Sequence, residues 1–542
     1  MKLEMNERDW RFVEGAWSQS AEGITTAPEN LGDQNLAIYA SRAWKDFEAE
    51  FDFRWDIVWT DAGLVFRATD ARHYYLVHFP VVGQHYRAEH FWALVSKVDE
   101  RGYVEVLKME MIHGVSSMPF LWHHVKVSVR DRTIRVWIDG RPMTPVIDET
   151  YAKPGYVGLR TFDALASGPR SSFRNVRITG EPVAADPYDP KPQPERNWFR
   201  VTDVAGHGCG NIVRVANGDL LTTVISSMTV DKPTPYQLRS SDHGRTWTVE
   251  GLDSRYINGL RRRGPKGTLE LYDVSIDPPF TINRFVSTDH GQTWSEPTQV
   301  GEVKFPEEFP WQKWYGSRLL ETRNGTLCLL AYTDMEGPLR NLKGRMYRDL
   351  PVPWSSGYCL RSTDGGNSWS DPVDIDGGPR DESKWMIAKE GSEISAAQTR
   401  DGKIVALVRP WCSPVMWETW SPDDGATWQP LARGPFPMYA CDNSMISTAS
   451  GALVIGGRFP GMGIQVSFDD GMTWKGYCID SAIWANGAMF EIEPNVVLFV
   501  YGGKDGLTEL RAQIFRVTSD NIEPVRVENH SRNPEGGANA KE

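Results

Sequence analysis

Two acidic side chains and two arginines recur at the same distances from a glycine turn in this 542-residue chain. Glu393 and Asp442 each lie nine residues before such a glycine, and Arg409 and Arg458 lie seven residues after the same glycines. Paired carboxyl groups supply the acid and the nucleophile or base of glycoside hydrolysis, and guanidinium groups beside them perturb their ionisation. We predict Glu393 and Asp442 as catalytic residues and Arg409 and Arg458 as substrate-binding residues. The alternative interpretation is a structural ion pair.

The glycine turn belongs to a repeat that occurs six times, each time before an apolar run. The turns centre on Gly218, Gly267, Gly325, Gly402, Gly451 and Asn495. If each repeat is one four-stranded blade of a ring, residues at the same offsets from the turn reach a shared central pocket. These positions hold Cys209, Asn258, Gly316, Glu393, Asp442 and Asn486 before the turn, and Ile225, Val274, Tyr332, Arg409, Arg458 and Gly502 after it. The further substrate-binding residues that we predict are Asn258, Tyr332, Trp484 and Asn486.

Five other aspartates belong to a second repeat, which gives them a structural role rather than a catalytic one. Five segments read Ser-x-Asp-x-Gly-x-Thr/Ser-Trp, and their aspartates are Asp242, Asp289, Asp364, Asp423 and Asp469. Asp and Ser side chains hydrogen-bond the backbone of a turn, Gly permits a positive φ, and Trp packs between sheets. These repeats predict an all-β propeller over residues 198–527, closed by pairing of residues 198–203 with the last sheet.

The second repeat resembles the Asp-box of the sialidase-like six-bladed β-propellers (the neuraminidase superfamily). The resemblance implies six blades, a Glu that polarises a nucleophilic Tyr at Glu393, and a carboxylate-binding Arg at Arg409. It also implies an acid/base role for Asp231, in the loop before the first Ser-x-Asp segment. The family's first Arg, expected near Gly208, and its Tyr nucleophile, expected near Asn486, are not found. The resemblance therefore implies a retained scaffold with changed chemistry.

The first third of the chain carries a different pattern. Alternating runs such as Phe47–Phe53 and His124–Val129 predict an antiparallel β-sandwich over residues 1–181. The segments 63–68, 122–127 and 155–161 resemble the concanavalin-like (laminin-G-type) jelly rolls. The resemblance implies either a glycan-binding module or a domain that only packs on a catalytic partner. A proline-rich linker is expected at 182–197 and a polar tail at 528–542.

The composition of the chain limits the kinds of partner that the protein is expected to bind. The net charge is −12, and the longest basic run has only three arginines (261–263), which argues against nucleic acid. No stretch reaches the roughly 20 apolar residues of a membrane span. The N-terminal residues lack the apolar core of a secretion signal, so we expect a cytoplasmic protein, or a secreted one if a signal was removed. No metal-binding motif or cofactor fingerprint is present, and the sequence leaves the oligomeric state open.

Together these features favour an exo-acting glycoside hydrolase that removes a terminal sugar with pocket carboxylates. His207, in a glycine-rich run at the expected pocket mouth, is a candidate general acid or base, or simply a polar lining residue. Two alternatives remain within glycan recognition: a polysaccharide lyase that uses His207 or a Tyr to remove a proton beside a uronate, and a non-catalytic glycan-binding protein. A protein-interaction scaffold is the third, because propellers often serve that way.

Overall fold

The computed structural model describes most of the chain. The described residues are 1–26, 34–58, 60–81, 90–163, 171–189, 196–202, 208–225, 235–251, 259–305, 313–334, 356–376, 392–409, 415–438, 444–481, 485–503 and 509–527. Their regular elements are β-strands, apart from one short 3-10 turn, η3 (Pro265–Gly267). Within these ranges, no helix has the length and apolar character that crossing a membrane requires. The fold is all-β, as predicted.

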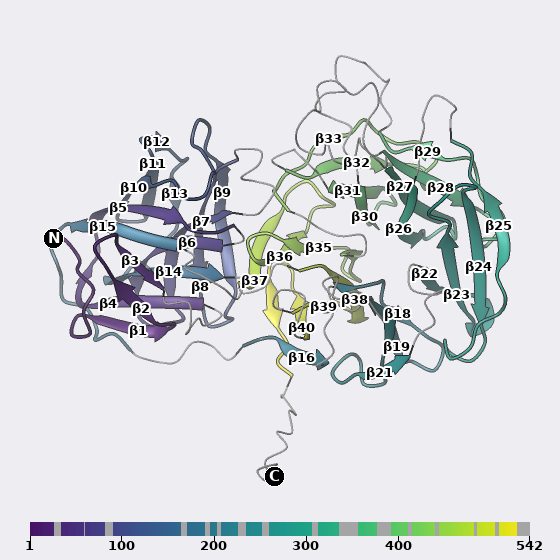
Figure 1. Ribbon diagram of the computed structural model, residues 1–542, viewed down its shortest axis with the longest axis horizontal. Coiled ribbons are helices and arrows are strands. Elements are labelled where there is room, and N and C mark those ends of the chain that lie inside the picture. Colours follow the sequence, from purple (N-terminus) through teal and green to yellow (C-terminus); the bar gives the residue numbers. More distant parts are fainter. Residues whose placement is uncertain are drawn as a thin grey trace, which may run out of the picture.

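The N-terminal region consists of two antiparallel sheets that share one core (Figure 1). The first sheet contains β2 (Trp17–Gln19), β3 (Ile24–Thr26), β5 (Phe47–Trp55), β10 (His123–Arg130), β11 (Thr133–Ile138), β12 (Arg141–Pro142), β13 (Val146–Ile147) and β15 (Ser171–Thr179). The second contains β1 (Trp10–Glu14), β4 (Gln34–Trp44), β6 (Thr60–Ala68), β7 (Tyr74–Val81), β8 (Trp92–Val98), β9 (Val104–Met111) and β14 (Gly155–Asp163). Every second residue of β5 is buried, and Phe53 stacks on Phe79 with ring centroids 4.6 Å apart. The alternating sequence pattern therefore places one face of each strand in the core.

The C-terminal part forms a β-propeller in which five sheets are separate blades. The first three are β17 (Gly208–Cys209), β18 (Val213–Arg214), β19 (Leu220–Ile225), β20 (Pro235–Ser240) and β21 (Thr248–Gly251); β22 (Leu260–Arg263), β23 (Leu269–Val274), β24 (Thr281–Ser287) and β25 (Thr298–Glu302); and β26 (Lys313–Glu321), β27 (Leu327–Asp334), β28 (Gly357–Ser362) and β29 (Val373–Asp374). The other two are β30 (Ser392–Gln398), β31 (Ile404–Arg409), β32 (Trp417–Ser421) and β33 (Ala432–Arg433); and β38 (Gly487–Glu493), β39 (Val496–Gly502), β40 (Leu510–Val517) and β41 (Ile522–Pro524), completed by β16 (Phe199–Thr202). β16 pairs with β40, which is the closing contact predicted for residues 198–203.

One further run of four antiparallel strands belongs to a larger sheet. β34 (Met445–Ser447), β35 (Leu453–Arg458), β36 (Met462–Ser467) and β37 (Lys475–Asp480) continue through β37 into β9 of the N-terminal region. Gly476, Tyr477 and Cys478 pair with residues 104–106, so that eleven strands form one sheet. The pairing covers the edge of β37, which would otherwise present unpaired backbone groups. Figure 1 shows the two parts of the molecule side by side, with β9 and β37 between them.

The first strands of successive four-stranded units contact one another around a centre. β22 contacts β26, β26 contacts β30, β30 contacts β34, β34 contacts β38, and β38 contacts β17. The glycine turns place the start of each first strand and the end of each second strand on the same side of this ring. The described residues among those counted from the turns, Glu393 and Arg409 included, therefore gather at one end of the central space.

The five Ser-x-Asp segments form one kind of turn. At the second segment, Ser287 Oγ donates to Asp289 Oδ1 at 2.8 Å, and the N–H groups of Gly291 and Thr293 donate to Ser287 Oγ and Asp289 Oδ1. The other four segments repeat these bonds. Hydrogen bonds from Thr293 lower the pKa of Asp289 to about 2. The aspartates are therefore acceptors that hold the turns, as the sequence predicted.

Candidate functional site

The site is built around an ion pair between Glu393 and Arg409. Glu393 lies at the start of β30, the first strand of its sheet, and Arg409 ends β31, the second strand. Arg409 Nη1 donates a hydrogen bond to Glu393 Oε2. The Arg409 side chain is 8% exposed and the Glu393 side chain is 21% exposed. A guanidinium so close favours the negatively charged carboxylate. The structure thus joins two of the residues predicted from the sequence.

The backbone at Glu393 is held in an unusual conformation. Its φ is +52°, in the left-handed region, and the pairing of β30 with β31 is interrupted between Ser392 and Ile394. The N–H of Ile394 donates to Ser317 Oγ of the neighbouring sheet at 3.1 Å. A bulge re-aims the side chain of its extra residue, and a non-glycine residue in this region costs on the order of 1–3 kcal/mol. The fold therefore stabilises a strained conformation that orients the Glu393 carboxylate.

Tyr332 occupies its predicted position at the end of a second strand. It lies in β27 opposite Tyr315 of β26, and the two rings stack with centroids 5.2 Å apart. Tyr315 was not predicted, because counting from the turn selects Gly316. An irregularity in pairing between Gly316 and Arg318 shifts the register by one residue, which such counting cannot detect.

Arg458 and Asn486 are also described. Arg458 ends β35, and Asn486 directly precedes β38. The Asn486 carbonyl accepts a hydrogen bond from the N–H of Gly502 at 3.1 Å, while its buried Oδ1 makes no hydrogen bond to any described residue. Both residues therefore lie at strand ends on the side of the ring that carries Glu393.

Five predicted site residues lie outside the described residues. These are His207, Asp231, Asn258, Asp442 and Trp484. The expected pairing of two carboxylates across neighbouring sheets, and the positions of the candidate acids, therefore remain predictions. Within the described part of the chain, no group of three or more His, Cys, Asp and Glu side chains is arranged to hold a metal ion.

Asp273 is a titratable group that the sequence did not single out. It lies near the end of β23, and burial raises its pKa to about 6. Burial also lowers the pKa of Arg261 and of Arg318 to about 10. Perturbed groups of this kind gather at functional sites, although structural burial also produces them. The sequence could have indicated Asp273 through its position, because it is an acidic residue one position before the end of a second strand.

A Ser–His–Asp arrangement in the N-terminal region has a different character. His78 Nδ1 lies 2.5 Å from Asp61 Oδ2, and His78 Nε2 lies 2.8 Å from Ser96 Oγ. The atoms follow the order of a catalytic triad. However, Asp61, His78 and Ser96 are each at most 1% exposed, so a substrate cannot reach the hydroxyl. The arrangement is a buried polar network on β6, β7 and β8.

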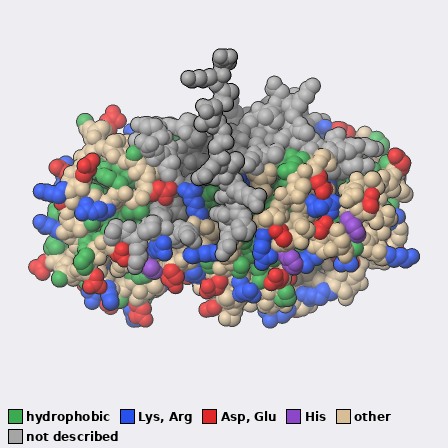
Figure 2. All heavy atoms as spheres, turned by 90° about the horizontal axis from the view of Figure 1, so that it is seen from below, with side chains coloured by type: hydrophobic (Ala, Val, Ile, Leu, Met, Phe, Trp, Pro, Cys, Tyr) green, Lys and Arg blue, Asp and Glu red, His purple; other side chains and the backbone are tan. Residues whose placement is uncertain are grey.

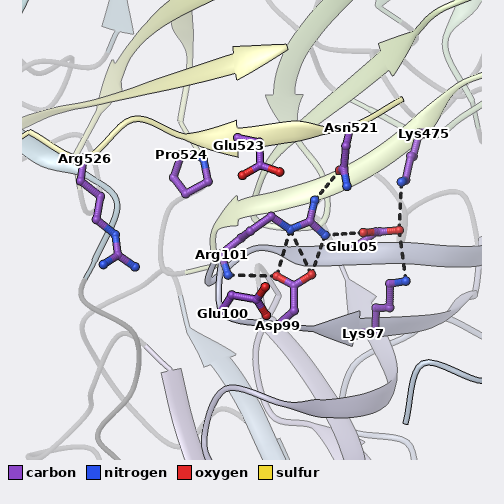
Figure 3. Close-up of a pocket in the computed structure, with 10 residues that line it drawn as sticks. All are labelled: Lys97, Asp99, Glu100, Arg101, Glu105, Lys475, Asn521, Glu523, Pro524 and Arg526. Atoms are coloured by element: carbon purple, nitrogen blue, oxygen red, sulfur yellow. Dashed lines mark hydrogen bonds and ion pairs between the residues drawn. The ribbon is translucent and has the colours of Figure 1, made fainter. Parts of the chain in front are cut away.

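A charged groove of about 690 Å³ lies where β9 meets β37 (Figure 3). At its centre Arg101 donates to Asp99, Glu105 and Asn521, and all three of its guanidinium nitrogens are engaged. Lys475 Nζ lies 3.1 Å from Glu105. These charges satisfy one another across the joint between the two parts of the molecule. On the face of the molecule in Figure 2, acidic and basic side chains are likewise interspersed over the described surface.

Comparison with known proteins gives two family matches. Residues 5–179 match the 3-keto-alpha-glucoside-1,2-lyase-like domain, and residues 252–479 match the BNR repeat-like domain, which is sialidase-like. No curated protein matches the chain.

Solved structures similar to the chain have low sequence identity. A Hadza microbial sialidase is 15% identical, with 94% of this chain and 99% of that one covered and a TM-score of 0.45. An alpha-L-arabinanase from Penicillium chrysogenum is 16% identical (59% and 98% covered, TM-score 0.42). A carbohydrate binding module from Bacillus subtilis is 20% identical (32% and 96% covered, TM-score 0.27).

Proposed function

We propose that this protein acts on glycans as an exo-acting glycoside hydrolase that releases a terminal sugar. The observation that carries the proposal is the Glu393–Arg409 pair, in which a strained backbone and a guanidinium fix one carboxylate at the end of the central space. Matches to the 3-keto-alpha-glucoside-1,2-lyase-like domain and to the BNR repeat-like domain support a glycan as the substrate. The central space of a propeller suits a chain end.

In this proposal Glu393 acts in its ionised form. A carboxylate held beside a guanidinium is a nucleophile or a base rather than a proton donor. As nucleophile it forms a bond to the anomeric carbon while the bond to the leaving oxygen breaks, and water then cleaves the bond between the sugar and Glu393. As base it removes a proton from a water that attacks the anomeric carbon while the bond to the leaving oxygen breaks. The leaving oxygen takes its proton from a second group, for which the candidates are Asp442, Asp231 and His207.

We further propose the finer architecture around this site. The run β34–β37 is the sixth blade, and its sheet is shared with the N-terminal region through the pairing of β37 with β9. The N-terminal region is a concanavalin-like jelly roll over residues 1–181, joined by a linker at 182–197 to a propeller at 198–527. Supporting this, β34 contacts the first strands of both neighbouring sheets.

A lyase is the second candidate, favoured by the lyase-like match over residues 5–179. A lyase removes a proton next to a carbonyl or carboxyl carbon and expels the glycosidic oxygen, so its product contains a carbon–carbon double bond. The product therefore distinguishes it from a hydrolase, which adds water.

The proposal is tested by measuring the sugars that the wild type and Glu393→Gln release from a panel of neutral and acidic glycosides. The panel includes sialosides. Glu418→Gln is the matched control, because Glu418 is a half-buried carboxyl residue in β32 of the same sheet. We expect release of a terminal sugar by the wild type and the control, and a loss of at least about 100-fold in Glu393→Gln. An unsaturated product would favour the lyase. Release that survives Glu393→Gln, or no release by the wild type, would overturn the proposal.

A further inference from the structure

The N-terminal region exposes a phenylalanine ring to solvent, on the loop that leads into β10. Phe120 is 66% exposed, and Met118 and Leu121 beside it are 41% and 46% exposed. We propose that this loop and the polar face of the sheet next to it form a glycan-binding site outside the propeller, in which a sugar ring stacks on Phe120. The proposal shares its ligand class with the proposed function, but it does not depend on Glu393.

The backbone of Phe120 has a conformation that favours glycine. Its φ is +70°, in the left-handed region, where a bulky side chain costs free energy. The Phe120 N–H donates to the carbonyl oxygen of Trp55 at 2.7 Å, and Trp55 is fully buried at the end of β5. The loop is thus fixed to the core beneath the exposed ring. Neither the strained backbone nor the exposed ring stabilises the described fold, whereas contact with a ligand accounts for both.

Hydrogen-bond donors lie beside the loop on the outward face of the first sheet. The indole of Trp122, two residues after the exposed ring, lies close to two guanidinium groups, whose Cζ atoms are 4.8 Å (Arg54) and 4.0 Å (Arg174) from its ring centroid. Their Nε atoms donate to Asp56 and Asp52 respectively, which orients the guanidinium planes. The terminal nitrogens of both arginines make no hydrogen bond to any residue that the structure describes, so they can donate to a ligand.

This combination of groups suits a sugar better than a lipid surface or a protein. The face of an aromatic ring carries partial negative charge, so it attracts the C–H groups on one face of a pyranose or furanose. The hydroxyl groups at the edge of the same sugar accept hydrogen bonds from guanidinium N–H groups. The apolar part has only three neighbouring exposed side chains and is followed by ion pairs, whereas a stable protein interface needs a wider surface. The ligand class is therefore a glycan whose sugar ring has one C–H-rich face.

The site is tested by affinity electrophoresis of the full chain in gels that contain arabinan, a mixed-linkage β-glucan, polygalacturonate or a sialylated mucin. We expect at least one of these glycans to retard the wild type. Phe120→Ala should raise the dissociation constant for that glycan about tenfold, and Phe120→Tyr, which keeps the ring, should stay within about twofold of the wild type. Ile147→Ala is the matched control and should bind as the wild type does, since Ile147 in β13 of the same sheet is also 66% exposed.

Phe120→Gly separates binding from stability. Glycine adopts a φ of +70° without strain, so this variant should unfold at no lower a temperature than the wild type. It should nevertheless lose retardation by the glycan, because it has no ring. Loss of retardation together with a fall in melting temperature would indicate a structural role for Phe120 and would overturn the proposal.

Three other outcomes would overturn the glycan site. They are an absence of retardation of the wild type by all four glycans, equal retardation of Phe120→Ala, and an oligomer of the wild type that dissociates in Phe120→Ala. In the last case the loop contacts a second copy of the chain, which sedimentation would show. The hydrolase proposal is tested separately, by sugar release and by Glu393→Gln. It can fail while the wild type is still retarded, and retardation can be absent while sugar is released.

Discussion

The guanidinium of Arg409 donates a hydrogen bond to the Glu393 carboxylate across the first two strands of one sheet. The pair joins a residue in a strained backbone conformation to one in regular strand geometry, so the fold fixes the carboxylate from two sides. Neither partner is more than about one-fifth exposed, and the pair is therefore only weakly screened by solvent.

Replacing Arg409 by alanine should lower turnover roughly 100-fold or more, because the Glu393 carboxylate loses its fixed position and its counter-charge. Product-release rates of the variant and the wild type check this effect. Arg433→Ala, an exposed arginine in β33 of the same sheet, is the control and should leave turnover unchanged. Unchanged turnover in Arg409→Ala would contradict the role of Arg409.

Replacing Asp289 by asparagine should destabilise the protein near neutral pH by about 1 kcal/mol, the order of a lost net hydrogen bond. The pKa of Asp289 is lowered from 3.8 to about 2 by the hydrogen bonds from Thr293, so the folded state favours the ionised form. Its stabilising contribution is present above pH 4 and is lost as the pH falls toward 2. Melting temperatures of the variant and the wild type should therefore converge in acid. Glu296→Gln, an exposed residue in the same blade, should match the wild type throughout.

Asp273 should have the opposite pH dependence. Burial raises its pKa from 3.8 to about 6, so the folded state disfavours the ionised form. The resulting cost is absent below about pH 4 and grows to at most about 3 kcal/mol as the pH rises through 6. Asp273→Asn should therefore unfold at a higher temperature than the wild type at pH 7.5 and at the same temperature at pH 4. Asp277→Asn, whose side chain is 70% exposed, is the control. If the stabilised variant also loses turnover, Asp273 has a task in the reaction; unchanged stability at pH 7.5 would contradict the effect of burial.

Arg101→Ala should weaken the joint between the N-terminal region and the propeller. The arginine side chain is 10% exposed and pairs with Asp99 and Glu105, and its hydrogen bonds to Asn521 and to the carbonyl of Ile522 cross to the propeller. Glu105 keeps Lys97 and Lys475 as partners, so the loss falls on the Asp99 carboxylate and on the hydrogen bonds to the propeller, at a cost of roughly 1–3 kcal/mol. Denaturant unfolding should show a lower midpoint, and separate transitions for the two parts would indicate that their cooperativity depends on this residue. Arg130→Ala, with a side chain 54% exposed, should leave the midpoint unchanged.

The sequence by itself determined the repeating parts of this protein. The Ser-x-Asp-x-Gly segments and the glycine turns indicated the propeller and its closing strand, and counting from a turn found Glu393, Arg409 and Tyr332. Such inferences succeed because each repeat is a local unit whose side chains bond their own backbone, so that its geometry is encoded within a few residues.

Only the tertiary structure decided what depends on contacts between units. The sharing of a sheet through β9 and β37, and the Arg101 pairs beside it, join residues about 370 and 420 positions apart, and no local pattern specifies that distance. The positive φ of Glu393 and the register shift that brings Tyr315 opposite Tyr332 likewise arise from packing between neighbouring sheets. The burial that raises the pKa of Asp273 is also a property of the assembled ring, because a single strand has no interior.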